Sequence, residues 1–548
     1  MPDHDSPTFY VTTPIYYVND RPHIGHVYTT TVADVLARYH RLAGEDVMFL
    51  TGTDEHAAKV VGAAAERGLT AQAWADTNAE VFESTFRRLH FTHDDFIRTS
   101  QPRHTDKVKR YIQALQQTDA IYLGQYEGWY DEGEEEYVPE ARAREHDYQS
   151  PISGRPLTKR SEDNYYFRLS AYRERVAQAI EDGTFRVAPE SRKNEILKRL
   201  ADAEDVPISR TGSGGWGIPM PGAEDHTVYV WIDALFNYLT TVDTDDRHRY
   251  WQSGAVHLIA KDILWFHAAI WPAVLMALAE HEDYQWVELP GMVYAHSFWI
   301  AEGQKMSKSL GNFIDLDKID RYIHQIGGLG QPEGGEIDFG RGLDALRYFL
   351  TTQGPMGSTD ADFAEAKYLD VYNSDLANGI GNAFSRVANM TAKYFEGVVP
   401  QPSTESNNGK SPLSAGAPSC DQYVGAINQL NLFDAVGEAR HRVDLVDKFI
   451  EHEQPFKLAK DPANLDRVGA ILYDCAEALR IASVLLWPVI PDACEKVWAR
   501  MGLDYKAQMD ASGGRGKLAE WVRWGGLQPG AKLEKGGPLF PRYQPPKA

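Results

Sequence analysis

Residues 9–54 read FYVTTPIYYVNDRPHIGHVYTTTVADVLARYHRLAGEDVMFLTGTD and decide the expected fold. Phe9–Thr13 form a β-rich apolar stretch that Pro14 should end, because proline has no N–H for a strand ladder. Over His26–Leu42 apolar side chains recur at helical spacing, and Asp46–Thr51 are a second apolar strand. Strand, helix and strand in this order predict a parallel α/β sheet, whose ligands bind beyond the carboxyl ends of its strands.

The alternation breaks over residues 119–226, which carry the acidic run Asp131–Glu136 and the glycine-rich Thr211–Gly217. We interpret this stretch as an insertion domain. Strand-like Thr227–Ile232 and Val256–Ala260, each followed by a helical pattern, then resume the α/β rhythm. The first domain is therefore expected to be split by the insertion.

The chain from Asp370 onward has a helical pattern. Apolar residues return every three or four positions over Leu376–Met390, while Asn382 and Arg386 share the opposite, polar face. Pro400–Cys420 is rich in Pro, Ser and Gly, so we expect a surface loop between helices there. The C-terminal part is therefore predicted to be an all-α domain.

Composition limits the possible functions. With 548 residues, 43% of them hydrophobic, the chain can form two to four packed domains. The formal net charge of −22 argues against a general nucleic-acid-binding protein, so an RNA partner would need a local basic surface. The three cysteines have no CxxC spacing and are expected to be reduced thiols. Because no leader or long apolar run is found, we expect a cytoplasmic protein without membrane contact.

A first chemical motif lies where the first strand is followed by the first helix. A helix N-terminus exposes unpaired N–H groups that attract phosphate. Gly25 lets a nucleotide approach the backbone closely, and His23 and His26 can donate hydrogen bonds to phosphate oxygens. Alone, these residues could equally be surface histidines in a turn.

A second motif is Lys305-Met306-Ser307-Lys308-Ser309, flanked by Gly303 and Gly311. Two lysines three apart in a mobile loop can neutralise the charge that builds on a triphosphate as pyrophosphate leaves. Alone, this stretch is more simply explained as a solvated loop. The presence of both motifs in one chain, in this order, favours a catalytic role for both much more than either motif does alone.

Together these segments resemble the HIGH and KMSKS motifs of class I aminoacyl-tRNA synthetases, in which a carboxylate attacks the α-phosphate of ATP in line. Within that class the chain is most similar to the methionyl-tRNA synthetase family, over nearly its whole length. The further segments that carry this likeness are Tyr10–Asn19, Thr51–His56, Tyr229–Ala234, Lys261–Ile263 and Trp271-Pro272.

The resemblance implies an enzyme that activates L-methionine with ATP, as its Mg²⁺ complex, to methionyl-adenylate and pyrophosphate. It would then transfer methionine to the 3′-terminal adenosine of tRNA(Met), including the initiator, without any DNA partner. The implied domains are a Rossmann-like catalytic domain (1–118 and 227–304), an insertion domain (119–226), the KMSKS loop with a stem-contact region (305–368), and a helical anticodon-binding domain with a C-terminal tail (369–548).

The resemblance also assigns site residues. The catalytic groups would be His23, His26, Lys305 and Lys308, and ATP would contact these four together with Gly25, Asp262 and Ser307. Methionine would be held by Ile15, Tyr17, Asp54, Trp231, Tyr238, Ile263, His267 and Trp271, with Asp54 on the ammonium. An aromatic cage suits a thioether, because sulfur–ring contacts contribute about 0.3 to 1.5 kcal/mol each. The anticodon would be read by Asn382, Arg386 and Phe456.

The chain departs from the family at several positions. Where many members have the ligands of a zinc knuckle, this sequence has Asp131, Glu134, Ser150 and Ser153, so no structural zinc is expected. Ala57 and Ala260 replace usual glycines, Phe456 stands where tryptophan is common, and Ile326–Gly342 is predicted to be an extra loop. Because the chain lacks an added C-terminal domain, we expect a monomer.

Two alternatives stay open at this point. One is a class I synthetase for leucine, isoleucine or valine, although the insertion is short for an editing domain. The other is a non-catalytic relative that binds tRNA as a module, although both histidines and both lysines of the motifs are intact.

Overall fold

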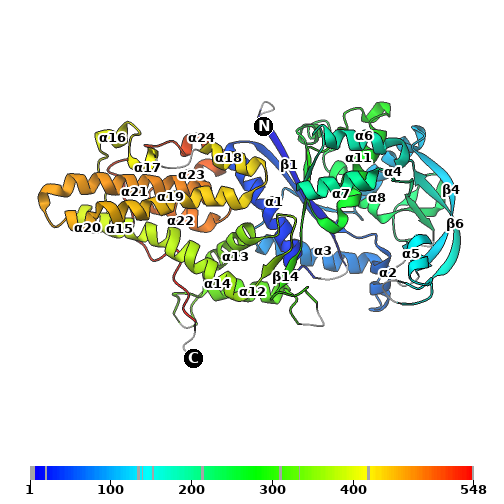
Figure 1. The fold of residues 1–548 in the computed structure, drawn as a ribbon, viewed down its shortest axis with the longest axis horizontal. Coiled ribbons are helices and arrows are strands. Elements are labelled where there is room, and N and C mark those ends of the chain that lie inside the picture. The colour runs from blue at the N-terminus through cyan, green and yellow to red at the C-terminus, as the bar shows by residue number, and fades with distance from the viewer. Residues whose placement is uncertain are drawn as a thin grey trace.

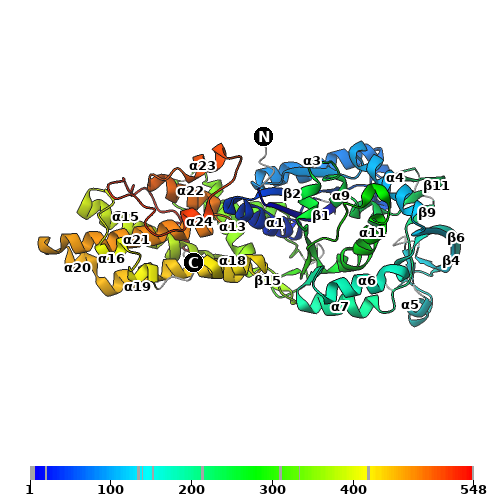
Figure 2. The same ribbon diagram turned by 90° about the horizontal axis from the view of Figure 1, so that it is seen from above.

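The computed structural model describes residues 6–18, 21–131, 136–138, 140–150, 154–211, 215–307, 311–332, 334–415 and 420–545. An α/β body and a helical body lie end to end, and helix α1 (Ile24–Ala43) lies between them (Figures 1 and 2). Within the described part of the chain, no helix has the length and apolar character needed to cross a membrane.

A six-stranded parallel sheet forms the centre of the α/β body, in the order β3-β2-β1-β12-β13-β7. The chain builds outward from β1 on one side and returns on the other, so the strand order reverses between β1 and β12. Ligands of open α/β sheets bind outside the carboxyl ends of the strands at such a reversal. The strands are β1 (Thr8–Tyr17), β2 (Asp46–Asp54), β3 (Asp95–Arg98), β7 (Arg186–Ala188), β12 (Val256–Ala260) and β13 (Met292–His296).

Helices cover this sheet and connect its strands, as the α/β pattern predicts (Figure 2). Besides α1 they are α2 (Ala58–Ala65), α3 (Ala71–Arg88), α4 (Pro102–Gln117), α8 (Val230–Leu235), α9 (Asn237–Thr240), α10 (His248–Gln252), a π-helical turn (Phe266–Ile270) and α11 (Trp271–Leu278).

Strand β1 continues past Pro14, where the sequence predicts its end. The pairing of β1 with β2 shifts register between Thr12 and Ile15. Pro14 therefore lies at an irregular step of the ladder that does not need its N–H. This prediction is wrong because a proline at a bulge is compatible with a strand, and the extension carries Ile15 and Tyr17 to the end of the sheet.

The stretch Thr227–Ile232 is not a single strand, contrary to the prediction. Strand β11 (Ala223–Val228) ends within it, and helix α8 begins at Val230. β11 belongs to a separate antiparallel sheet of order β10-β11-β9. A short apolar run cannot distinguish a strand from a buried helix, and in α8 Ile232 and Leu235 are buried one turn apart.

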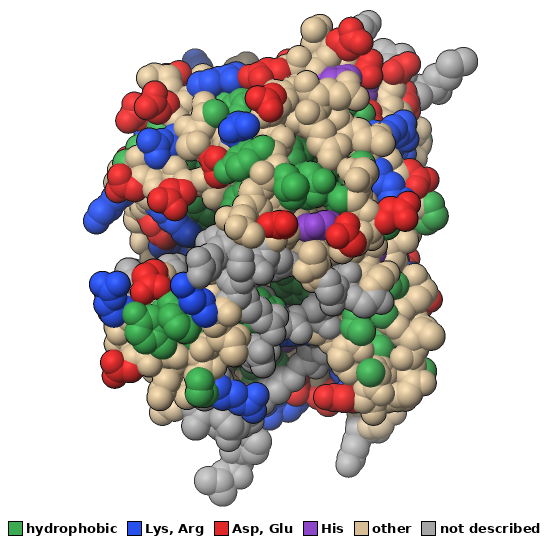
Figure 3. All heavy atoms as spheres, turned by 90° about the vertical axis from the view of Figure 1, so that its right-hand side faces the viewer, with side chains coloured by type: hydrophobic (Ala, Val, Ile, Leu, Met, Phe, Trp, Pro, Cys, Tyr) green, Lys and Arg blue, Asp and Glu red, His purple; other side chains and the backbone are tan. Residues whose placement is uncertain are grey.

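In its described residues, the predicted insertion adds two antiparallel sheets and three helices. Acidic, basic and apolar side chains are interspersed over this end of the molecule (Figure 3). Strand β7 lies within the predicted span 119–226 but pairs with β13 in the central sheet, so this span is not wholly separate from the catalytic domain. The domain boundaries stay predictions. Its elements are β4 (Ile121–Asp131), β5 (Glu136–Val138), α5 (Glu140–Glu145), β6 (Thr158–Phe167), α6 (Leu169–Glu181), α7 (Glu190–Leu200), β8 (Val206–Pro207), β9 (Ser209–Thr211), β10 (Pro219–Met220) and β11.

The helical body confirms the helical pattern of the C-terminal part. The loop predicted at Ile326–Gly342 is shorter, since α12 reaches Gly327 and α13 begins at Phe339. Pro400–Cys420 contains two short helices. In chain order the elements after β13 are β14 (Trp299–Ala301), α12 (Leu316–Gly327), α13 (Phe339–Gln353), β15 (Ala361–Phe363), α14 (Glu365–Val371), a π-helical segment (Tyr372–Gly381), α15 (Asn382–Phe395), α16 (Thr404–Asn407), α17 (Pro412–Ala415), α18 (Cys420–Asn428), α19 (Leu432–Glu453), α20 (Pro455–Leu458), α21 (Leu465–Leu486), α22 (Pro491–Arg500), α23 (Tyr505–Ala511) and α24 (Leu518–Trp521).

A buried ion cluster joins α1 to the helical body. The carboxylate of Asp34, on α1, lies 2.7 Å from the guanidinium groups of both Arg38 and Arg347, the latter on α13. Its other oxygen accepts hydrogen bonds from the backbone and hydroxyl of Thr92. Arg347 also donates to the carbonyl of Pro488, in the turn between α21 and α22. Burial alone would raise the pKa of Asp34, but these two cations hold it well below its usual value.

Replacing Asp34 should therefore destabilise the junction strongly. Asp34→Ala leaves two buried guanidinium groups without their anion, and we expect the free energy of unfolding to fall by about 3 to 5 kcal/mol. Chemical denaturation followed by circular dichroism measures this. Asp320→Ala is the matched control, because it removes a surface pair with Arg88 at 2.5 Å and should cost less than about 1 kcal/mol. Equal, small losses in both variants would contradict the role of the cluster.

Candidate active site

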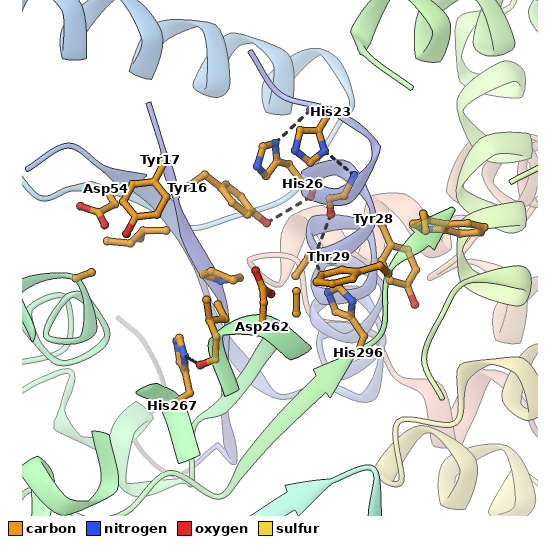
Figure 4. Close-up of a pocket in the computed structure, with 18 of the residues that line it drawn as sticks. Tyr16, Tyr17, His23, His26, Tyr28, Thr29, Asp54, Asp262, His267 and His296 are labelled. Carbon is orange, nitrogen blue, oxygen red and sulfur yellow. Dashed lines mark hydrogen bonds between the residues drawn. The ribbon is translucent and has the colours of Figure 1, made fainter. Parts of the chain in front are cut away.

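A cavity of about 590 Å³ lies at the carboxyl ends of the central strands, where the strand order reverses. Figure 4 shows Asp54 beside Tyr17 on one side, the two histidines of α1 on another with Tyr16 between, and Asp262 below the histidines in this view. It is lined by most of the predicted site residues, namely Ile15, Tyr17, His23, Gly25, His26, Asp54, Trp231, Tyr238, Asp262, Ile263 and His267.

The histidine turn forms the start of α1. Nδ1 of His23 accepts a hydrogen bond from the N–H of Gly25 at 3.1 Å, and Nδ1 of His26 accepts from the N–H of His23 at 3.2 Å. A ring that accepts at Nδ1 is neutral and carries its proton on Nε2. Burial and then the neighbouring His23 hold the pKa of His26 well below its usual value, which agrees with a neutral ring. Each histidine therefore carries its proton on Nε2, and both residues line the cavity.

Space at this turn is narrow. A Cβ at Gly25 would lie 2.9 Å from Cε1 of His23, so a larger residue would push the His23 ring aside. The glycine thus preserves the cap geometry as well as close access to the first N–H groups of the helix.

The segment just after the lysine motif is attached to the histidine turn. The N–H of Ile24 donates to the carbonyl of Ile314 at 3.0 Å, and His23 forms a β-bridge with Asp315. The rings of His23 and Phe313 are 5.1 Å apart, and Phe313 lines the cavity. The segment that follows the lysine motif therefore lies against the histidine turn, far from it in the sequence.

The lysine motif itself lies at the edge of this junction. Lys305 is exposed, and its carbonyl accepts from the amide of Asn312 at 3.1 Å. The N–H of Ser307 donates to the same Asn312 side chain at 2.8 Å. Neither residue lines the cavity, and Lys308 lies outside the described residues. The fold brings the segment after the motif to the histidines, while Lys305 lies outside the cavity lining.

Asp54 is a buried carboxylate at the carboxyl end of β2. It is only 2% exposed, and among the described residues no hydrogen-bond partner meets its Oδ1. Burial first, and then the charges of Asp233 and Glu55, raise its pKa well above the usual value. A cationic group entering the cavity would supply the partner that this carboxylate lacks.

Asp262 follows β12, on the other side of the strand-order reversal. The surrounding walls desolvate it and raise its pKa, while the backbone N–H groups of Asp262 and Ile263 oppose that shift. It lies closer to the histidine side of the cavity than His267 does (Figure 4). A carboxylate here can accept hydrogen bonds from ligand hydroxyl groups.

Aromatic rings form the wall next to Asp54. Tyr17 meets Trp231 edge to face at 5.8 Å between ring centres, and Trp231 stacks on Phe266 at 4.2 Å. The hydroxyl of Tyr238 bonds Nε2 of His267 at 2.8 Å. Burial lowers the pKa of His267 to about 4, so the ring is neutral at pH 7. This part of the cavity therefore suits an apolar, polarizable group.

Trp271, predicted to line the pocket, lies behind its wall. It is fully buried, and its ring meets Tyr238 at 6.2 Å between centres. Its Nε1–H donates to Nε2 of His257 at 3.3 Å, and Nδ1 of His257 bonds the hydroxyl of Thr12 at 2.8 Å. Trp271 thus supports Tyr238 rather than facing the cavity.

Sequence reasoning missed part of the lining. His296, at the end of β13, bonds the hydroxyl of Thr29 on α1 at 2.7 Å and so ties that strand to the histidine helix. Two features of the sequence could have indicated these residues. His296 is at the end of a parallel strand, and Thr29 is one helical turn after the phosphate-binding turn. The lining residues not predicted are Pro14, Tyr16, Tyr28, Thr29, Ala234, Leu235, Ala260, His296, Ser297, Phe298, Trp299 and Phe313.

The predicted anticodon residues lie in the helical body, away from this cavity. Asn382 is exposed at the start of α15, and Arg386, one turn later, bonds Asp447 of α19 at 2.5 Å. Phe456 is 44% exposed on α20, which directly follows α19. An exposed aromatic ring of this kind is available for stacking.

The insertion shows an apolar cluster where metal ligands would be expected. Asp131 and Ser150 are buried, whereas Glu134 and Ser153 lie outside the described residues. In the described part of the chain, no group of three or more His, Cys, Asp or Glu is arranged to hold a metal ion. The same stretch forms a small core of Val138, Ala143 and Leu157, with Trp129 and Tyr148 packed against it.

Comparisons with known proteins agree with this geometry. The chain matches the family described as tRNA synthetases class I (M) over residues 9–146 and 144–388. It is 38% identical over 557 residues to the methionine–tRNA ligase of Streptomyces coelicolor, covering 98% of this chain and 97% of that protein. It is 36% identical over 543 residues to the methionine–tRNA ligase of Caldanaerobacter subterraneus, covering 98% of this chain and 79% of that protein.

Solved structures resemble the chain over the same length. Mycobacterium tuberculosis methionyl-tRNA synthetase in complex with methionyl-adenylate superposes with a TM-score of 0.83 and 33% identity, covering 98% of this chain and 100% of that one. Its free state superposes with a TM-score of 0.80 and 30% identity, covering both chains completely.

Proposed function

The chain belongs to the methionyl-tRNA synthetase family of class I tRNA synthetases, and from this premise we propose which of its side chains carry each step. It activates L-methionine with ATP to methionyl-adenylate and pyrophosphate, and then transfers methionine to tRNA. The observation that carries the assignment of the site is the buried Oδ1 of Asp54, which no described protein group meets, beside an aromatic wall.

The methionine ammonium binds Asp54, and the thioether side chain lies against the aromatic wall. An ammonium meets the unsatisfied carboxylate, while Tyr17 and Trp231 supply ring contacts for sulfur. Neutral His267, held by Tyr238, adds a polar but uncharged contact. Discriminating against a side chain one methylene shorter is worth only about 1 to 3 kcal/mol, which requires close walls. Ile15 and Ile263 complete this part of the lining, and Trp271 fixes Tyr238 from behind.

ATP, entering as its Mg²⁺ complex, binds at the start of α1. The Nε2–H groups of His23 and His26 donate to phosphate oxygens, and Gly25 leaves room for the phosphates at the helix N-terminus. The methionine carboxylate then attacks the α-phosphorus, the bond to the bridging oxygen breaks, and pyrophosphate leaves. Asp262 holds the ribose hydroxyls, and Lys305, Ser307 and Lys308 neutralise the charge that builds on the leaving pyrophosphate.

The helical body recognises tRNA(Met), the initiator included. Asn382 and Arg386 hydrogen-bond the anticodon bases, and Phe456 stacks on one of them. The pair with Asp447 holds Arg386 in one orientation. The acidic remainder of the chain, with its net charge of −22, suppresses loose binding of other nucleic acids, DNA included.

The insertion works without structural zinc. The core of Val138, Ala143 and Leu157, covered by Trp129 and Tyr148, stabilises the tip of the insertion by apolar burial instead of metal coordination. We also infer a cytoplasmic monomer.

The function is tested by amino-acid-dependent ATP–pyrophosphate exchange with each of the twenty amino acids. Methionine should give the highest kcat/KM, with leucine, isoleucine and valine at least about tenfold lower, the discrimination that one methylene provides. Charging of tRNA(Met) transcripts checks the second step. A better substrate than methionine, or tRNA binding without any exchange, would overturn the proposal.

The pH dependence of methionine binding tests the role of Asp54. Because burial raises its pKa, the free carboxyl is protonated at low pH, whereas the ammonium binds its ionised form. The KM for methionine should therefore fall as pH rises through the range in which this carboxyl ionises, which lies above the usual range of an aspartate, and calorimetry in buffers of different ionisation enthalpy should show proton release on binding in that range.

Asp54→Asn is the matched variant for this measurement. It should raise the KM for methionine at least about tenfold and remove its pH dependence, since the amide cannot ionise. The KM for ATP should change little. A flat profile in the unsubstituted protein, with no proton released, would contradict the assignment.

A further inference from the structure

Three buried carboxylates lie next to one another at the proposed methionine site. Asp54 is 2% exposed, and Glu55 and Asp233 are fully buried. Two of them have partners within the protein: Glu55 accepts hydrogen bonds from the guanidinium of Arg98 at 2.7 and 3.1 Å, and Asp233 lies between two imidazoles. Only Asp54 has an oxygen that no described protein group meets.

The contacts of Asp233 connect three elements distant in sequence. Its Oδ2 lies 2.6 Å from Nδ1 of His56, in the turn after β2, and its Oδ1 lies 2.6 Å from Nε2 of His104, on α4. Asp233 itself is on α8. The other ring nitrogen of His104 bonds the hydroxyl of Thr240 at 3.1 Å. A carboxylate bonded through both oxygens has one orientation, and it fixes the two rings as well.

The turn that Asp233 holds is the turn that supports Asp54. The backbone N–H of His56 lowers the pKa of the Asp54 carboxyl and partly offsets the effect of burial, and the two residues share one short segment. Trp216 covers the other side: its ring meets His56 edge to face at 5.3 Å, and its Nε1–H donates to the carbonyl of Glu55 at 2.6 Å. Asp233 and Trp216 together leave this segment little freedom.

We propose that Asp233 is a positioning residue for the amino-acid substrate. Its bonds to His56 and His104 fix the turn after β2, and they leave Asp54 as the one carboxylate of the three that takes the substrate ammonium. This inference rests on the proposed methionine site. Asp233 does not line the cavity and acts only through the segment that carries Asp54.

The charges around the cluster agree with this assignment. Burial opposes ionisation of Asp233, but the charge of His56 and the bonds from both imidazoles hold its pKa below the usual value. Burial lowers the pKa of His56, but the charge of Asp233 and the hydrogen bond to it raise this pKa above its usual value. Both shifts favour the ion-paired form of Asp233 and His56. Other groups that act on Asp54, Glu55 or Asp233 are Tyr17 of β1, Tyr238 of α9, Arg98 of β3 and His104 of α4, and Arg98 is also paired with Asp76 of α3.

The test is Asp233→Asn in the full-length protein, assayed by methionine-dependent ATP–pyrophosphate exchange. The amide keeps the shape but cannot accept from both imidazoles. The KM for methionine should rise at least about tenfold, the loss of one well-aligned charge-assisted bond, while kcat and the KM for ATP stay within about threefold. Asp243→Asn, which removes a carboxylate bonded to Tyr111 at 2.7 Å, is the matched control and should leave all three constants unchanged.

A second measurement separates positioning from general damage. 4-(Methylthio)butanoate is methionine without its amino group, so its inhibition constant does not depend on Asp54. It should be the same, within about twofold, in the unsubstituted protein and in Asp233→Asn. An unchanged KM for methionine, or an equal loss of affinity for the deaminated analogue, would overturn the proposal. Absence of exchange in the unsubstituted protein would instead refute the proposed function.

If Asp233→Asn does not fold, His56 provides an independent test. Asparagine at position 56 places an amide N–H where Nδ1 of the ring lies, so it can still donate to Asp233, whereas alanine cannot. His56→Ala should raise the KM for methionine at least about tenfold, and His56→Asn should restore it to within about threefold of the unsubstituted value. Equal constants in the two variants would show that the bond to Asp233 does not position Asp54.

Discussion

A carboxylate in a protein interior costs several kcal/mol unless a cation or hydrogen-bond donors meet it. The α/β body contains three such groups side by side, and the partners of two of them come from the protein itself: Arg98 for Glu55, and His56 with His104 for Asp233. The third, Asp54, faces the cavity. An incompletely paired carboxylate lowers the stability of the folded protein, and a ligand that pairs with it restores that stability. A binding site differs in this way from a protein interior whose polar groups are all paired.

The topology of the sheet places this carboxylate and the nucleotide turn in one cavity. β2 ends with Asp54, and β1 leads to the histidine turn. Asp262 follows β12, on the other side of the strand-order reversal. The short bridge of His23 to Asp315 brings the base of the lysine loop to the same place. The ion cluster around Asp34 anchors the far part of α1 in the helical body, so the histidine helix touches both halves of the molecule.

Most of the fold and much of the site could be predicted from the sequence, because strand, helix and turn signals around the two motifs are local. The failures have physical causes. Pro14 was compatible with β1 because a register shift removed the need for its N–H. The prediction of one strand over residues 227–232 was wrong because a short apolar run is compatible with both a strand and a helix. Thr29 and His296 were not predicted as lining residues, because tertiary packing decides which face of a buried segment meets a cavity.

The most direct measurement is a crystal structure of the protein with methionine and a non-hydrolysable ATP analogue. The account predicts the methionine nitrogen at hydrogen-bond distance, about 3 Å, from the Asp54 carboxylate, the sulfur against the ring of Trp231, and phosphate oxygens at Nε2 of His23 and His26. A methionine bound with its ammonium away from Asp54, or a nucleotide seated away from the histidine turn, would contradict it.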